Sequence, residues 1–100
     1  MKIIHDSPFV DKRKHTIEFH LEISSAKKVS LAGTFNHWAQ DVLQLHPTKK
    51  GVWTIRIPML PNGVYKYKFF IDEKMWMEDI ENPLREPDGC SGWNSILAIN

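Results

Sequence analysis

Alternation of apolar and polar residues constrains the fold of this chain more than any other feature of its sequence. Between positions 16 and 23, polar residues alternate with the apolar residues Ile17, Phe19, Leu21 and Ile23. Because successive side chains of an extended strand point to opposite faces, this stretch predicts a strand with one buried face. No window of a dozen residues keeps apolar positions at helical spacing. We therefore expect an all-β fold.

Short strand patterns recur along the rest of the chain, separated by turn-forming residues. They predict strands at residues 29–33, 53–57, 64–72, 75–77 and 94–99. The stretch 80–92, which is rich in proline and glycine, has the composition of a loop. About seven short strands, with turns roughly every eight to twelve residues, indicate an antiparallel β-sandwich.

The strand predicted at 64–72 carries information on both faces. Its core face is indicated by Tyr65, Tyr67, Phe69 and Ile71. The other face interleaves lysines with Phe70, so we expect it to contact solvent or a ligand. A tight turn then leads into a short stretch around Trp76, which predicts a hairpin.

Length and charge limit the partners of the chain. One hundred residues suffice for one compact domain. The formal net charge is +1 and the lysines are scattered, so the basic patch required by nucleic acid or an anionic membrane is missing from the sequence.

The single cysteine, Cys90, and the lack of a secretory signal pattern lead us to expect a cytoplasmic protein. No apolar run approaches the roughly 18 residues of a membrane span.

The residue inventory argues against catalysis. A glycosidase needs two carboxylates about 5 to 10 Å apart; five acidic residues fall between positions 78 and 88, but their spacing predicts a solvated loop. No GxSxG motif surrounds Cys90, Ser91 or Ser95. The five histidines, His5 among them, are spread along the chain without metal-ligand spacing. We expect no catalytic residue, no metal and no cofactor.

The tryptophans offer a binding surface instead. Trp53 alternates with Ile55 and Ile57, which favours a place in the core. Trp38 and Trp76 lie in polar stretches without apolar periodicity, which suggests a flat ligand. Composition alone leaves an alternative open for both, because amphipathic tryptophans also cover the ends and edges of cores.

Three motifs, in this order, resemble a known family. They are the run 29–38, which ends in Phe-Asn-His-Trp, the run 65–72 followed by Trp76, and the ending 94–99. Together they resemble carbohydrate-binding module family 48, the glycogen-binding module. Relatives are the β subunits of AMP-activated protein kinase and the N-terminal domains of isoamylases and glycogen branching enzymes.

The resemblance covers about residues 14–99, nearly the whole chain. It implies an immunoglobulin-like early-set β-sandwich. Residues 1–13 are then an N-terminal extension and residues 14–100 the module. The ligands it implies are α-1,4-linked glucans such as glycogen, starch and malto-oligosaccharides.

The same resemblance implies roles for individual residues. Trp38 and Trp76 would stack on glucose rings, while Lys68 and Asn94 would bond to hydroxyls. A flat indole suits the apolar face of glucose, and ammonium and amide groups suit the hydroxyls around it. Where the glycogen-binding kinase subunits carry a leucine and a threonine, this chain has the stretch 90–93. We place Trp93 at the flank of the site, with sealing of the core as its alternative role.

The function expected from these observations is non-catalytic binding of α-1,4-linked glucans, with dissociation constants of about micromolar to millimolar. The alternative is a protein-interaction or regulatory module, associated with a glucan-active enzyme or kinase, whose sugar site is weakened. A small hydrolase or transferase is disfavoured, because a domain of this size has little material for a cleft. The sequence is compatible with a stand-alone module and with an excerpt of a larger glucan-metabolising enzyme, such as a glycoside hydrolase of family 13.

Overall fold

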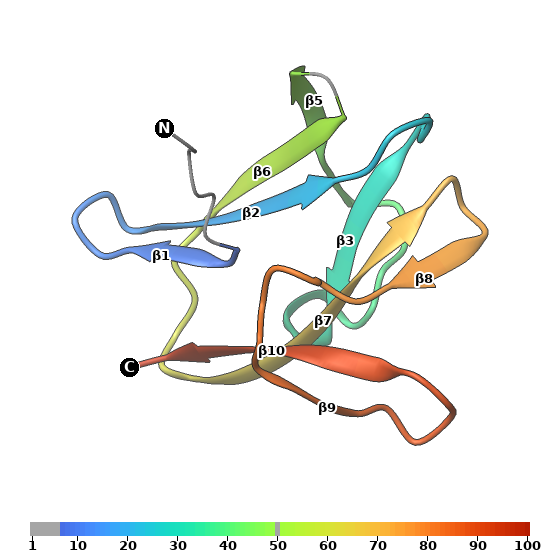
Figure 1. Ribbon diagram of the computed structural model, residues 1–100. Coiled ribbons are helices and arrows are strands. Elements are labelled where there is room, and N and C mark those ends of the chain that lie inside the picture. The colour runs from blue at the N-terminus through green and yellow to red at the C-terminus, as the bar shows by residue number, and fades with distance from the viewer. Residues whose placement is uncertain (1–6, 50) are drawn as a thin grey trace.

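The structure, a computed structural model, describes residues 7–49 and 51–100, which form ten strands in two antiparallel sheets (Figure 1). The strands are β1 (Phe9–Asp11), β2 (Thr16–Glu22), β3 (Val29–Gly33), β4 (Leu43–Gln44), β5 (His46–Lys49), β6 (Val52–Pro58), β7 (Gly63–Ile71), β8 (Met75–Met77), β9 (Arg85–Pro87) and β10 (Trp93–Ile99). One sheet has the order β1-β2-β6-β5, and the other β4-β3-β7-β10-β9 with β8 paired to β7. The prediction of an all-β, immunoglobulin-like early-set sandwich is confirmed.

The core lies between the two sheets and is supplied by the alternating strands. Strand β2 buries the three apolar residues Ile17, Phe19 and Leu21, as its sequence pattern predicts. Trp53 of β6 is buried beside them, which confirms its predicted place in the core. Burying an apolar side chain of the size of isoleucine, leucine or phenylalanine stabilises the fold by about 1.5 to 3 kcal/mol. The opposite sheet contributes Tyr67 of β7, whose ring meets Phe19 edge to face at a centroid distance of 5.0 Å.

Strand β7 is the centre of the six-stranded sheet. One of its edges pairs with β3 through residues 67–71. The other edge is shared: β10 pairs with residues 63–67, and β8 pairs with residues 69–71. Lys68 therefore lies at the junction between β10 and β8. The predicted hairpin between β7 and β8 is present, and its turn residues Asp72 and Glu73 both have positive φ.

Four strands were not predicted, and all of them are short. Strands β1 and β5 are the edges of the four-stranded sheet, and β4 and β9 are the ends of the other. Edge strands need no buried alternation, so their sequences carry little signal. Strand β1 lies within the predicted N-terminal extension and pairs with β2, while residues 1–6 of that extension lie outside the described part of the chain. Strand β9 lies within the stretch 80–92, whose composition predicts a loop.

Asp79 is the hub of a buried hydrogen-bond network, so the prediction of a solvated acidic loop is wrong at this residue. Its carboxylate accepts hydrogen bonds from the hydroxyls of Ser7 at 2.5 Å and Tyr67 at 2.8 Å, and from the amide of Glu81 at 3.1 Å. Its own amide donates to Ser95 Oγ at 2.8 Å. A carboxylate is tolerated in a core only when such donors replace water. Burial raises the pKa of Asp79 above its ordinary value.

Two further properties hold for the described part of the chain. None of its helical segments is long and apolar enough to cross a bilayer. Among residues 7–49 and 51–100, no group of three or more histidine, cysteine or acidic side chains is placed to hold a metal ion, and His5 lies outside these residues.

Candidate functional site

A shallow pocket of about 160 Å³ opens on the outer face of the six-stranded sheet. It is lined by Trp38, Lys68, Trp76 and Asn94. These are four of the five residues nominated from the sequence. Lys68 comes from β7, Trp76 from β8 and Asn94 from β10, so the junction of β8 and β10 along β7 brings three of them together.

Trp38 reaches the pocket from the loop that follows β3. This loop contains a short 3-10 helix, η1 (Thr34–Asn36), after which His37 and Trp38 both have positive φ, 57° and 59°. A bulky residue rarely adopts this left-handed conformation, so the surrounding structure must hold it there. The Trp38 amide donates to the Gly33 carbonyl at 2.8 Å, and the Asn36 side chain accepts from the Gly33 amide at 3.0 Å. The backbone strain at Trp38 thus coincides with a residue of the pocket.

Trp76 is supported from below by Phe70, its cross-strand partner on β7. The two ring centroids are 4.5 Å apart, with 33° between the ring planes. Phe70 is buried by this contact, whereas Trp76 keeps 39% of its surface exposed. Trp38 meets Trp76 edge to face, with centroids 6.2 Å apart and planes at 77°. The two indoles therefore form a corner and not a flat platform.

Lys68 is held by an acidic residue that the sequence interpretation placed in a solvated loop. Its ammonium donates to Asp88 Oδ2 at 2.5 Å, and both side chains are mostly buried, with 16% and 13% exposed. Asp88 Oδ1 also accepts from the amides of Cys90 at 2.8 Å and Gly92 at 3.1 Å. The bond from Lys68, followed by these amide bonds, lowers the pKa of Asp88 to about 2. Asp88 is therefore ionised at neutral pH, and the pair carries no net charge.

Trp93 is not among the residues that line this pocket. Neighbouring residues of a strand point to opposite faces, so Trp93 and Asn94 diverge at the start of β10. The Arg85 guanidinium sits 3.9 Å from the centroid of the Trp93 ring, a cation–π contact, and Trp93 is 38% exposed. Its predicted role at the flank of the site remains a prediction.

Sequence reasoning missed two residues that support the pocket. The strand pattern places Phe70 on the face expected to contact solvent or a ligand, but it does not reveal that the Phe70 ring packs under Trp76. The spacing of the acidic residues predicts a solvated Asp88, although an aspartate followed by Gly-Cys-Ser-Gly is a turn pattern in which the carboxylate accepts bonds from later amides. That pattern is the signal that points to Asp88.

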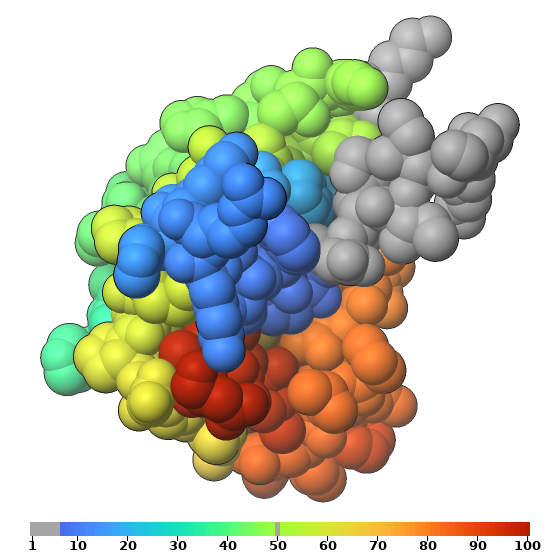
Figure 2. Space-filling view, turned by 90° about the vertical axis from the view of Figure 1, so that its left-hand side faces the viewer, coloured from blue at the N-terminus to red at the C-terminus, as the bar shows by residue number. Residues whose placement is uncertain are grey.

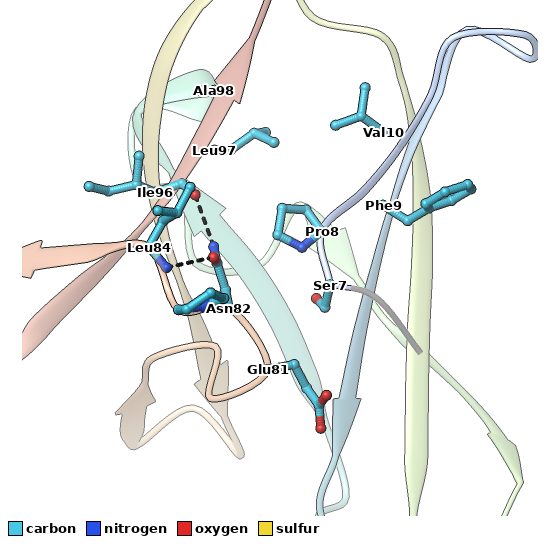
Figure 3. Close-up of a pocket in the computed structure, with 11 residues that line it drawn as sticks. Ser7, Pro8, Phe9, Val10, Glu81, Asn82, Leu84, Ile96, Leu97 and Ala98 are labelled. Carbon is cyan, nitrogen blue, oxygen red and sulfur yellow. Dashed lines mark hydrogen bonds between the residues drawn. The ribbon is translucent and has the colours of Figure 1, made fainter. Parts of the chain in front are cut away.

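A second hollow of about 360 Å³ lies between β1 and the second half of β10 (Figure 3). Figure 2 shows this face, where the segment around β1 lies beside the end of β10. The hollow is lined mainly by apolar residues, among them Pro8, Val10 and Leu97. Asn82 closes one side by donating to the Ile96 carbonyl at 2.9 Å.

Three comparisons relate the chain to known proteins. Residues 15–99 match the family model described as the glycogen recognition site of AMP-activated protein kinase. Over 66 residues the chain is 33% identical to the 1,4-alpha-glucan branching enzyme GlgB 1 of Clostridium perfringens, in strain SM101 and in strain 13, which covers 64% of this chain and 10% of each enzyme. The crystal structure of a protein assigned as an alpha amylase of Salmonella typhimurium superposes with a TM-score of 0.64 and 19% identity, covering 84% of this chain and 13% of that one. The last similarity concerns the fold alone. The chain thus spans only a small part of the length of these relatives.

Proposed function

The chain belongs to the family of the glycogen recognition site of AMP-activated protein kinase, and from this premise we propose that it binds α-1,4-linked glucans non-catalytically. The binding site is the pocket of Trp38, Lys68, Trp76 and Asn94. The observation that carries the proposal is their convergence: four residues spread over 57 positions, from 38 to 94, line one pocket. This arrangement joins two aromatic rings to an ammonium and an amide, which suit the apolar face and the hydroxyls of a sugar.

The corner between the two indoles favours an α-linked chain. Rings at 77° cannot both lie flat against successive residues of a straight ribbon, such as a β-1,4-linked glucan. An α-1,4-linked chain curves, so neighbouring glucose rings present their faces in different directions. Trp76 offers the ring face opposite Phe70 to one such residue.

The carboxylates support a binding role over catalysis. A glycosidase requires a general acid with a raised pKa beside its substrate. Asp88, next to the pocket, has its pKa lowered to about 2 and is engaged by Lys68. Asp79 has a raised pKa, but it is fully buried in the core. Neither residue combines access to a sugar with the protonation that the reaction needs.

Calorimetric titration with maltoheptaose and with cellohexaose tests the proposal. We expect maltoheptaose to bind with a dissociation constant of about micromolar to millimolar, because each hydroxyl bond contributes only about 0.5 to 1.5 kcal/mol. Cellohexaose should bind at least about tenfold more weakly. Equal affinity for the two sugars would exclude α-1,4 selectivity, and release of reducing sugar from starch would exclude a purely binding role.

We also propose that the module acts beside a glucan-active enzyme. The branching enzymes that it resembles are about ten times the length of the matched region, and the hollow beside β1 presents exposed Phe9 and Leu84 on an apolar surface. Exposed apolar patches commonly mark protein contacts. Leu84→Asp should weaken capture of a branching enzyme by the immobilised chain, while leaving maltoheptaose binding unchanged. Equal capture by wild type and variant would remove this surface from consideration.

A further inference from the structure

The two lysines on the outer face of β7 are each matched by an acidic residue. Lys66 pairs with Glu86 at 2.7 Å, and Lys68 pairs with Asp88 at 2.5 Å. The lysines are two residues apart on β7, and their partners are two residues apart on β9 and the loop after it. Both pairs reach across β10, which separates β7 from β9. On the face that carries the pocket, the positive charges of Lys66 and Lys68 are therefore each balanced by the negative charge of an acidic partner.

Asp88 does more than neutralise a lysine. Its Oδ1 accepts three amide bonds from residues 90–92, which closes this loop next to the pocket. Gly92 leaves the space that the pair occupies: a Cβ built on it would stand 2.9 Å from Asp88 Oδ2 and 3.7 Å from Lys68 Nζ. The backbone amides of residues 90–92 thus hold the Asp88 carboxylate in place, and the carboxylate holds the Lys68 ammonium in place.

We propose that Asp88 is the specificity-determining residue of the glucan pocket: it orients the Lys68 ammonium and cancels its charge, so the pocket selects neutral glucans over phosphorylated ones. This inference rests on the proposed function. An ammonium with three donors keeps two for glucose hydroxyls when one is given to Asp88. Without Asp88, the same ammonium is a mobile cation that attracts a phosphate group by charge.

Asp88→Asn tests the proposal, because it keeps an oxygen for the loop amides and removes the charge. Calorimetry compares maltoheptaose with maltoheptaose that carries one phosphate ester on a 6-hydroxyl. We expect the variant to bind the neutral sugar about two- to tenfold more weakly, as one charge-assisted hydrogen bond is lost. It should bind the phosphorylated sugar more tightly than the wild type does, and the gain should shrink in high salt.

Two further variants control the experiment. Glu18→Gln removes the same charge from an ion pair with Arg56, at 3.5 Å, on the opposite sheet, and should leave the preference between the two sugars unchanged. In Lys68→Gln, the Asp88 carboxylate loses its cationic partner and should reduce binding of the phosphorylated sugar more than binding of the neutral one. This reciprocal variant tests the proposal even if Asp88→Asn fails to fold.

The possible failures are distinct. If the wild type binds neither sugar, the glucan-binding function is wrong. If the wild type binds maltoheptaose but Asp88→Asn has the same ratio of affinities for the two sugars as the wild type, the function stands and the role of Asp88 is wrong. A merely structural role for Asp88 would weaken both sugars equally and would add no salt dependence.

Discussion

The Tyr67 hydroxyl donates a 2.8 Å hydrogen bond to the Asp79 carboxylate inside the core of the sandwich. Tyr67 also accepts a bond from Asn82 at 3.0 Å, and the Ser7 hydroxyl completes the shell of Asp79. This network ties the segment before β1 to the central strand β7 and to the segment before β9. Stability of the fold therefore depends on the buried Asp79 side chain, which does not line the pocket on the outer face.

Removal of the Asp79 carboxylate should destabilise the fold strongly. Asp79→Ala leaves the hydroxyls of Ser7 and Tyr67 and the amide of Glu81 without their acceptor. Each buried unsatisfied group costs about 1 to 3 kcal/mol, so we expect the free energy of unfolding to fall by at least about 3 kcal/mol. Urea denaturation followed by tryptophan fluorescence measures this. A fall below about 1 kcal/mol would mean that water reaches the site and replaces the carboxylate.

The same residue makes stability depend on pH. Burial raises the folded-state pKa of Asp79 above its unfolded value of about 3.8. Its contribution to the free energy of unfolding is therefore complete below about pH 4 and is lost as pH rises through the folded-state pKa. Asp79→Asn cannot titrate, so relative to the wild type it should gain stability as pH is raised above about 4. Urea midpoints for both proteins from pH 3 to 8 test this, and parallel curves would contradict it.

Because the backbone at Gly33 is closely packed, a side chain at this position should lower the free energy of unfolding. A Cβ would press against the Lys66 carbonyl and lie 2.8 Å from the Phe35 ring. Gly33→Ala should lower the free energy of unfolding by about 1 to 3 kcal/mol, as other overpacking substitutions do. Gly89→Ala is a control for backbone strain alone, because a Cβ at Gly89 meets open space while its φ of +86° is one that side chains rarely adopt. Similar losses in the two variants would show that packing at Gly33 is not special.

Phe70 should affect glucan binding without touching the sugar. Phe70→Ala removes the ring that packs against Trp76 at 4.5 Å, so Trp76 loses its fixed orientation. We expect maltoheptaose affinity to fall about three- to thirtyfold, equivalent to roughly 0.6 to 2 kcal/mol. Val64→Ala, at an exposed position on the same face of β7, should leave affinity unchanged. Equal affinities for the wild type and Phe70→Ala would show that Trp76 needs no support.

The parts of the fold that sequence reasoning found are those whose burial alternates along the chain. Strands β2 and β7 each bury one face in the core. Their apolar residues therefore recur at every second position, and this period is visible in the sequence. Edge strands such as β5, whose four residues are all exposed, carry no such pattern. Asp79 could not be identified because its donor Ser7 is 72 positions away, and nothing local distinguishes a buried carboxylate from a solvated one.

The pocket was accessible to prediction through its motifs, but its geometry was not. The motifs indicated Trp38, Lys68, Trp76 and Asn94, whereas the 77° angle between the indoles depends on a strained backbone at Trp38 and on the floor supplied by Phe70. The divergence of Trp93 from Asn94 follows from strand alternation, once the first residue of β10 is known to be Trp93.

The most direct test of glucan binding in this pocket is calorimetric titration of maltoheptaose into the wild type and three tryptophan variants. Trp38→Ala and Trp76→Ala each remove one wall, and we expect affinity to fall at least about tenfold in both, or about 1.4 kcal/mol. Trp93→Ala tests the predicted role at the flank of the site, and its loss of affinity should be smaller than in the two pocket variants, because Trp93 does not line the pocket. Wild-type affinity in both pocket variants, with folding confirmed by circular dichroism, would contradict the assignment.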